Sequence, residues 1–181
     1  MKIVVVTSNA NKAREVAAFF EGVCAVEHVA LECPEFRHDD VGEIAREKAR
    51  FAFEQLGVPL IADDTGFSIA ALGGFPGPYA AYVLDTIGIE GILRLMEGKE
   101  DRDAYFETAI ALADGDGVRV FRGRIDGRIV DPRGEGGFGY DPIFEVEGRT
   151  LAELPLEEKA MISHRGRALA ALKAWLSEGR C

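Results

Sequence analysis

A run of four β-branched residues near the start of the chain, residues 3–6, constrains the fold most strongly. Such a short continuous apolar run predicts a strand buried on both faces, as in the centre of a sheet covered by helices. A polar loop over residues 7–11 follows, and then a helix whose apolar side chains Val16, Phe19 and Phe20 recur three and four positions apart. A buried strand that leads directly into an amphipathic helix indicates an α/β protein.

The middle of the chain departs from this alternation of strands and helices. Asp40 and Glu43 have the spacing of a capping box and open a helix that we expect to end at Gly57. Two long strand-like segments, 104–113 and 118–129, are joined by Asp-Gly-Asp-Gly, which is typical of a hairpin turn. Because a hairpin is antiparallel, the pattern predicts an α/β fold with a mixed sheet.

The last third of the chain contains one more expected strand and two helices. A glycine-rich loop over 133–139 precedes a segment, 142–146, that we predict to be the final strand. Helices are expected over 156–162 and 163–177. We find no internal repeat, low-complexity tract or linker, so we expect a single domain over residues 1–181.

Composition restricts the classes of partner. The formal net charge of −10 and the pI near 4.8 argue against binding to DNA or RNA, which needs a basic face. No apolar run reaches the ~20 residues of a membrane span. Cys24, Cys33 and Cys181 are odd in number and lack CxxC spacing, which fits neither a disulfide framework nor a zinc site. We therefore expect a cytoplasmic protein with reduced thiols and no membrane partner.

Two adjacent carboxylates, Asp63 and Asp64, follow the apolar residues Leu60, Ile61 and Ala62. We expect the strand to stop there. Since neighbouring strand residues point to opposite faces, one carboxylate would face a cleft and the other would turn inward to a backbone group. A carboxylate in this position suits a hard cation or a water molecule that must lose a proton. The alternative is an Asx turn that only closes the strand.

The first loop and the first helix could bind phosphate. Thr7, Ser8, Asn9 and Lys12 surround a helix N-terminus, where free N–H groups attract anions. Lys12 lies in the first turn, which is unfavourable for a cation unless a negative ligand is present. Ordinary capping by Ser8 or Asn9 is the alternative. Lys48, on the next helix, is either a lysine that extends past apolar surface to solvent or a second phosphate ligand.

Two further polar segments lie toward the C-terminus. Residues 136–142 combine glycines with two aromatic residues and a carboxylate, so the loop could approach and stack on a base, although a bulged turn is the alternative. Ser163 is a good N-cap for the last helix and places His164 and Arg165 in its first turn. With Lys159 nearby, these residues suggest contacts to an anion or to a base edge.

Taken in order, these segments resemble the inosine triphosphate pyrophosphatase family, the HAM1-type pyrophosphatases of non-canonical purine nucleotides. The matching motifs are [ST]-x-N-x-x-K, A-D-D-[ST]-G, G-G-x-P-G, G-G-F-G-Y-D-P-I-F and E-K-x-x-[IL]-S-H-R-G, at residues 7–12, 62–66, 73–77, 136–144 and 158–166. They span nearly the whole chain, so their joint occurrence by chance is very improbable.

The resemblance implies Mg²⁺-dependent hydrolysis of ITP, dITP or XTP to the monophosphate and pyrophosphate. It implies that Asp64 is the proton acceptor and a metal ligand. Glu35 is the best match to a second metal ligand, with Glu32 as the alternative. Substrate contacts are implied for Thr7, Ser8, Asn9, Lys12, Lys48, Thr65, Phe138, Gly139, Tyr140, Asp141, Lys159, His164 and Arg165.

The same resemblance implies an elongated mixed sheet with two α/β lobes that flank a central nucleotide cleft, and a homodimer. Hydrogen-bond donors near His164 and Arg165 would favour 6-oxopurines over adenine. Two other functions remain open. Phosphatases with an aspartate nucleophile carry DxDx[TV] after the first strand, whereas here the aspartates are adjacent and follow the third strand. A non-catalytic nucleotide sensor would gain nothing from a carboxylate beside phosphates.

Overall fold

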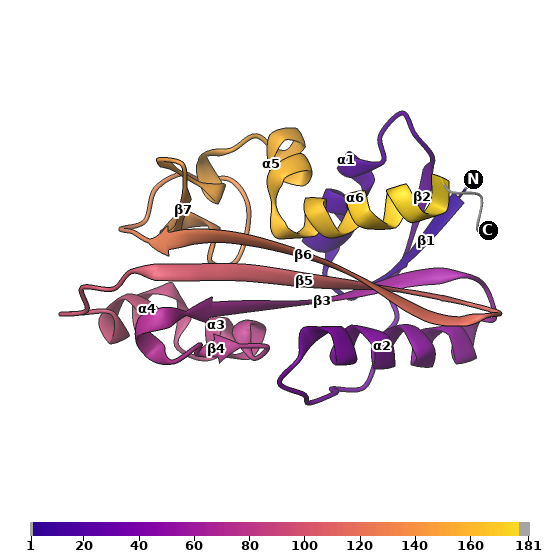
Figure 1. The fold of residues 1–181 in the computed structure, drawn as a ribbon, viewed down its shortest axis with the longest axis horizontal. Coiled ribbons are helices and arrows are strands. Elements are labelled where there is room, and N and C mark those ends of the chain that lie inside the picture. The colour runs from indigo at the N-terminus through magenta and orange to yellow at the C-terminus, as the bar shows by residue number, and fades with distance from the viewer. Residues whose placement is uncertain (1, 178–181) are drawn as a thin grey trace.

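The computed structural model describes residues 2–177, and over these residues eight strands form one mixed sheet flanked by helices (Figure 1). The strand order is β2-β1-β3-β5-β6-β7-β8, and β4 pairs with β3. The strands are β1 (Lys2–Val6), β2 (Ala25–Val29), β3 (Leu60–Ile69), β4 (Pro76–Gly77), β5 (Asp103–Asp114), β6 (Gly117–Ile129), β7 (Phe144–Val146) and β8 (Arg149–Thr150). The α-helices are α1 (Ala10–Phe19), α2 (Val41–Leu56), α3 (Ala80–Thr86), α4 (Gly88–Leu95), α5 (Leu156–Ile162) and α6 (His164–Ser177).

The sheet is mixed, as predicted. Strand β1 pairs in parallel with β2 and β3, whereas β3, β5, β6, β7 and β8 pair antiparallel in turn. The β5–β6 hairpin runs along the length of the molecule, and its strands pair from Asp103↔Arg128 to Asp114↔Gly117. The described part of the molecule is therefore elongated along these strands (Figure 1).

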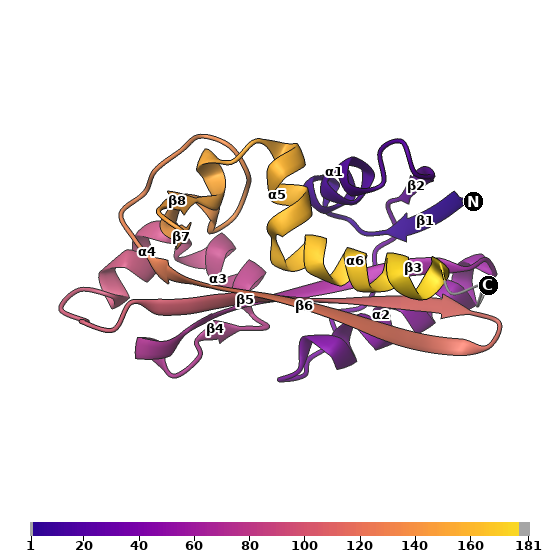
Figure 2. The ribbon, with the colours of Figure 1, turned by 45° about the horizontal axis from the view of Figure 1, so that its top comes forward.

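Helices cover the sheet differently at its two ends. At one end, α1 and α6 pack on one face against Ile3, Val5 and Ile61, and α2 packs on the other face against Val4 and Val6. At the other end, α3, α4, β7 and β8 surround a separate aromatic core. Figure 2 shows α5 beside α1, between these two groups of elements. The arrangement confirms the expected lobes at the two ends of one sheet.

Strand β3 does not stop at the two aspartates. It continues to Ile69, because Asp63 and Asp64 pair across the sheet with Ile110 and Ala109 of β5. Gly66 is therefore a strand residue. A Cβ at Gly66 would lie 3.1 Å from a methyl carbon of Val41, so the glycine allows close approach of α2 to the strand. The Asx-turn interpretation is wrong, since long-range pairing with β5 keeps the polar residues extended.

The predicted final strand over 142–146 is also shorter and is not the last. Residues Asp141–Ile143 form a 3-10 helix with Pro142 in its first turn, so β7 begins only at Phe144. Strand β8 follows β7 and pairs with it. By contrast, the helix predicted to begin at Asp40 matches α2, which Asp40 caps through its side chain and Gly57 ends in a left-handed conformation with φ 65°.

Candidate active site

The site lies where the sheet has a gap beside β3. Strand β1 pairs with β3 as far as Val6↔Ala62, and β4 pairs with β3 only from Phe67↔Gly77 onward. Between these points, the edge of β3 has no neighbouring strand on that side among the described residues. A cavity of about 330 Å³ opens there and reaches both faces of β3.

Both aspartates line this cavity, so the expectation that one would turn inward to a backbone group is wrong. Asp63 lies on the face of the sheet that α1 and α6 cover, and it pairs with Lys12 and Arg165. Asp64 lies on the face that α2 covers, and it pairs with Lys48. Alternation along the strand is preserved, and the gap in the sheet lets one cavity touch both side chains.

The cavity collects every residue that the sequence assigned to substrate or metal. The residues come from both lobes and from six separate segments: Thr7, Ser8, Asn9, Lys12, Glu35, Lys48, Asp64, Thr65, Phe138, Gly139, Tyr140, Asp141, Lys159, His164 and Arg165. Their proximity shows that four of the five motifs meet at one cavity, whereas no residue of the motif at 73–77 lines it. Proximity does not by itself give each residue a role.

The helix N-terminus at α1 is capped from within the loop. The side chain of Asn9 accepts hydrogen bonds from the backbone N–H groups of Asn11 (2.9 Å) and Lys12 (3.3 Å), whereas Ser8 is exposed. The ammonium of Lys12 lies 3.2 Å from a carboxylate oxygen of Asp63. Burial lowers the pKa of Lys12, and Asp63 opposes that shift. A carboxylate of the protein, rather than only a ligand, therefore offsets the charge of Lys12.

Lys48 and Asp64 form the second ion pair of the site. The ammonium of Lys48 donates to Oδ1 of Asp64 at 2.5 Å, so Lys48 turns into the cavity instead of extending to solvent. The other oxygen, Oδ2, is buried and has no hydrogen-bond partner in the described structure. Burial raises the pKa of Asp64, and the nearby ammonium of Lys48 limits that rise. Asp64 thus has one held oxygen and one free oxygen.

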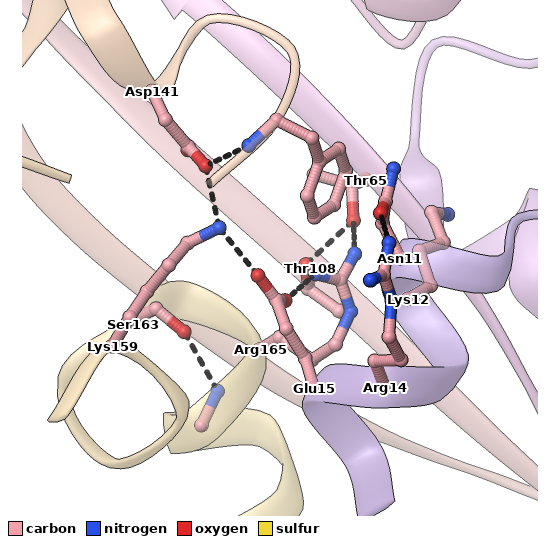
Figure 3. Close-up of polar contacts among 12 residues, drawn as sticks. Asn11, Lys12, Arg14, Glu15, Thr65, Thr108, Asp141, Lys159, Ser163 and Arg165 are labelled. Carbon is pink, nitrogen blue, oxygen red and sulfur yellow. Dashed lines mark hydrogen bonds and ion pairs between the residues drawn. The ribbon is translucent and has the colours of Figure 1, made fainter. Parts of the chain in front are cut away.

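Lys159 and Arg165 are deeply buried and fully paired with carboxylates. Lys159 bonds Asp141 at 2.5 Å and also Glu15, and Arg165 bonds Glu15 (Figure 3). Arg165 also bonds Asp63 at 3.0 Å. Burial would raise the pKa of Asp63, but Lys12 and Arg165 hold it well below its usual range. Carboxylates of the protein therefore already compensate both cations, and their contact with a substrate stays a prediction.

Glu15 is the residue that sequence reasoning missed. It lies on α1 next to Val16, which belongs to the apolar stripe of the helix, and it is only 2% exposed although it is a carboxylate. Its position four residues before Phe19 placed it on the buried side of the helix. A buried carboxylate needs a cationic partner, so the position of Glu15 on the apolar side of the helix could have predicted a buried ion pair.

Two glycines allow α5 and α6 to come together at the site. A Cβ at Gly166 would lie 2.2 Å from the carbonyl oxygen of Ala160, and a Cβ at Gly123 would lie 2.1 Å from that of His164. Ser163 caps α6 by accepting a hydrogen bond from the N–H of Gly166 at 3.2 Å. Only glycine at these positions lets α6 begin so close to α5 and β6.

Aromatic side chains form the wall of the cavity that contains Tyr140 and His164. Tyr140 donates its hydroxyl to the carbonyl of Ala80 at 2.6 Å, and its ring stacks on Phe67 with centroids 4.6 Å apart. His164 is 3% exposed and stacks on Phe106, also at 4.6 Å. Burial, helped by the nearby cations, lowers the pKa of His164 well below its ordinary value, so the ring is neutral. His164 therefore adds no second positive charge beside Arg165 in the first turn of α6.

The loop before β7 is held from inside by Asp141. Its carboxylate accepts the backbone N–H of Phe138 at 2.7 Å as well as the ammonium of Lys159. Gly137 has φ 67°, and a Cβ there would lie 2.2 Å from an oxygen of Asp141. Asp141 therefore shapes the loop around Phe138, whose ring faces the Lys159 ammonium at 4.5 Å.

The donor set for a metal ion is small. Among residues 2–177, no group of three or more His, Cys, Asp or Glu side chains is arranged to hold an ion. The free oxygen of Asp64 and the carboxylate of Glu35, which lines the same cavity, fit a cation that takes its remaining ligands from substrate. Glu32 does not line the cavity.

Comparison with known proteins identifies the family. The sequence profile of the Ham1 family matches residues 3–175. The chain belongs to the Ham1 family. The dITP/XTP pyrophosphatase of Methanopyrus kandleri is 50% identical over 182 residues, which cover 97% of this chain and 96% of that protein. Inosine triphosphate pyrophosphatase 2 of Trypanosoma cruzi is 47% identical over 178 residues, which cover 96% and 91%.

The fold agrees with solved Ham1 structures. A HAM1 protein from Coxiella burnetii superposes with a TM-score of 0.85 at 35% identity, over 98% of this chain and 99% of that one. This Ham1-family chain has no helix between residues 2 and 177 that combines the length and apolar character needed to cross a membrane.

Proposed function

We propose that this Ham1-family enzyme hydrolyses triphosphates of non-canonical purine nucleosides, ITP, dITP and XTP, to the monophosphate and pyrophosphate. Relatives that match nearly its whole length are named dITP/XTP pyrophosphatase and inosine triphosphate pyrophosphatase. The observation that carries the proposal is the free, buried Oδ2 of Asp64 in a cavity that three lysines also line.

In this proposal Asp64 accepts the proton of the attacking water through Oδ2. A general base works best when its pKa lies near the working pH, and burial moves the pKa of Asp64 in that direction. Lys48 keeps the carboxylate oriented through Oδ1. Lys12 and Lys48 are more exposed than Lys159 and Arg165, so an entering triphosphate reaches them first. An ammonium has three N–H donors, so Lys48 can bind a phosphate oxygen while it still holds Asp64.

The charge of the cavity explains why a divalent cation belongs with the substrate. Its lining has four cationic side chains, Lys12, Lys48, Lys159 and Arg165, and four carboxylates, Glu35, Asp63, Asp64 and Asp141. A nucleoside triphosphate carries about four negative charges, which this balanced lining cannot compensate. Mg²⁺ held by Asp64 and Glu35 would screen the phosphates from the carboxylates and polarise the phosphorus.

The aromatic wall is the proposed base site. Phe138 and Tyr140 enclose one side, and the neutral His164 presents Nδ1, which has no partner among residues 2–177. A neutral imidazole can donate to O6 of inosine or xanthosine. Adenine presents an amino group at this position and would leave the donor unsatisfied, at a cost of ~1–3 kcal/mol per group.

A nucleotide panel tests the function. We expect pyrophosphate from ITP, dITP and XTP, with kcat/KM well above that for GTP and roughly 10²–10⁴-fold above that for ATP. Arg165→Ala should reduce the differences in kcat/KM between these nucleotides and should also lower kcat. Release of orthophosphate would indicate a phosphatase, and absence of turnover would indicate a sensor. Equal kcat/KM for ATP and ITP would overturn the proposed base site even if pyrophosphate were released.

We further propose a homodimer, located in the cytoplasm. Large apolar side chains around α3 and α4 are exposed: Phe75 (41%), Tyr79 (46%), Tyr82 (70%), Ile87 (45%) and Leu95 (45%). A cluster of this kind supports an interface. Light scattering that gives the mass of one chain, 19.7 kDa, at micromolar concentration would contradict the dimer. The free thiols of Cys24 and Cys33 support a reducing compartment, whereas Cys181 lies outside the described residues.

A further inference from the structure

Glu15 connects two walls of the cavity without reaching the cavity itself. One of its carboxylate oxygens bonds Lys159 of α5, and the other bonds Arg165 of α6. Both cations line the cavity, whereas Glu15 lies behind them and is 2% exposed. Figure 3 shows Glu15 on α1, between the two cationic side chains.

The three residues belong to a longer chain of buried charges that alternate in sign. It runs from the loop before β7 to the first turn of α1: Asp141, Lys159, Glu15, Arg165, Asp63 and Lys12. Glu15 is the only link in this chain that joins its Lys159 half to its Arg165 half in the described structure. Removing its charge would divide the chain into two shorter pieces.

The geometry of Glu15 cannot be reproduced by the related side chains. Glutamine has one accepting oxygen, so it could satisfy one cation, while its amide N–H₂ would face the other. Aspartate keeps the charge but is one methylene shorter, so it could reach one cation and would still compensate both at longer range. Glu15→Gln, which removes the charge, should therefore disturb Lys159 and Arg165 more than Glu15→Asp, which only shortens the side chain.

We infer that Glu15 is a positioning residue that fixes Lys159 and Arg165 in the cavity wall. Through Lys159 it fixes Asp141 and the loop that carries Phe138. Through Arg165 it fixes Thr65, whose hydroxyl accepts from the guanidinium at 3.0 Å. Glu15 thereby controls how well the site distinguishes bases. The kinetic part of this inference rests on the proposed function, and the structural part does not.

The structural part is tested by proton exchange of the Arg165 Nε–H, followed by NMR on the full chain. This group donates to Asp63 at 3.2 Å and belongs to a residue that is 1% exposed, so its exchange should be slow in the wild type. Glu15→Gln should speed it by about tenfold or more, as local opening becomes easier. Glu145→Gln, which removes an ion pair with Arg133 outside the cavity, is the matched control and should leave it unchanged.

The kinetic part is tested with the same variants and with Glu15→Asp. Glu15→Gln should lower kcat for ITP by about 10²-fold, the scale of a small misplacement of binding groups, and should reduce the preference for ITP over ATP. Glu15→Asp should have a higher kcat for ITP and a stronger preference for ITP over ATP than Glu15→Gln. Glu145→Gln should keep the wild-type kcat and preference. These comparisons are made between variants of equal thermal stability, or at a temperature well below each unfolding midpoint.

The outcomes separate the two proposals. Absence of pyrophosphate release from the wild type would overturn the proposed function, while faster Arg165 exchange in Glu15→Gln would still support the role of Glu15. Unchanged exchange and an unchanged ratio of ITP to ATP turnover in folded Glu15→Gln would overturn the inference. Loss of thermal stability with an unchanged ratio would also overturn it, because Glu15 would then only stabilise the fold.

Discussion

Lys48 donates to one oxygen of Asp64 at 2.5 Å and leaves the other oxygen of that carboxylate buried, with no partner among residues 2–177. The two residues come from α2 and β3, and they meet because β3 extends past the end of β1. One interaction therefore orients the carboxylate, and the free oxygen remains available for a water molecule or a cation.

Lys48→Met tests that orientation. The ammonium of Lys48 counteracts the effect of burial on Asp64, so its removal should raise the pKa of Asp64 further. The acidic limb of kcat/KM should then move to higher pH, because the base stays protonated over a wider range. KM should rise by roughly 10–100-fold, since charged hydrogen bonds contribute ~1.5–3 kcal/mol. Lys173→Met, at an exposed position of α6, should behave as the wild type.

Glu35→Gln tests the proposed metal ligand. A carboxamide is a weaker ligand for a hard cation than a carboxylate, so the Mg²⁺ concentration for half-maximal activity should increase several-fold. Glu32→Gln is the matched control, because Glu32 does not line the cavity. A shift in Glu32→Gln without one in Glu35→Gln would move the ligand to Glu32.

Asp63→Asn should reduce stability more than it alters the chemical step. Asp63 is paired with Lys12 and Arg165, and removal of one partner from a buried ion pair costs about 3–5 kcal/mol. Because its folded pKa is depressed, Asp63 stabilises the fold fully above its unfolded pKa of about 3.9. That contribution is lost as the pH falls toward the folded pKa.

Denaturant titrations between pH 7 and pH 3 measure both parts of the Asp63 prediction. The variant should be less stable at pH 7, and the difference from the wild type should narrow in acid. A constant difference over the whole range would show that the charge of Asp63 contributes nothing to stability.

Much of this fold follows from local patterns, and the exceptions depend on distant contacts. The run at residues 3–6 and the capped helix after Asp40 could be predicted, because their signals lie within a few residues. The extension of β3 through Asp63 could not, since it depends on pairing with β5. Glu15 was missed for the same reason: its partners, Lys159 and Arg165, lie 144 and 150 positions away.

In the candidate site, too, local motifs could be predicted from the sequence, whereas contacts between distant residues could not. The motifs identified which residues gather in the cavity, including the cap at the start of α1 and the loop that contains Tyr140. They did not reveal that Lys159 and Arg165 are already neutralised by carboxylates. Residue type alone gives the charge of a side chain, whereas its partners decide whether that charge is available.

His164 should make the fold sensitive to mild acid. Its folded pKa is well below that of an unfolded histidine, about 6.5. Below that pH the unfolded state therefore binds a proton at this residue, whereas the folded state does not. Stability is therefore retained above pH ~6.5 and lost as the pH falls below it, by up to ~1.4 kcal/mol per pH unit.

His164→Phe keeps an aromatic ring against Phe106 and removes the titration. The decrease in thermal midpoint between pH 7.5 and pH 5.5 should be smaller in this variant than in the wild type. Equal acid sensitivity of the wild type and His164→Phe would contradict the neutral, buried state of His164.

Asp64→Asn tests the central claim most directly, by pyrophosphate release from ITP. The amide cannot accept the proton of the attacking water, so kcat should fall by ~10²–10⁴-fold. The thermal midpoint should not fall, because the raised pKa of Asp64 means that its ionised form opposes folding. Asp126→Asn, on exposed surface, is the control and should keep full activity. Pyrophosphate release by folded Asp64→Asn at a rate near that of the wild type would contradict the account.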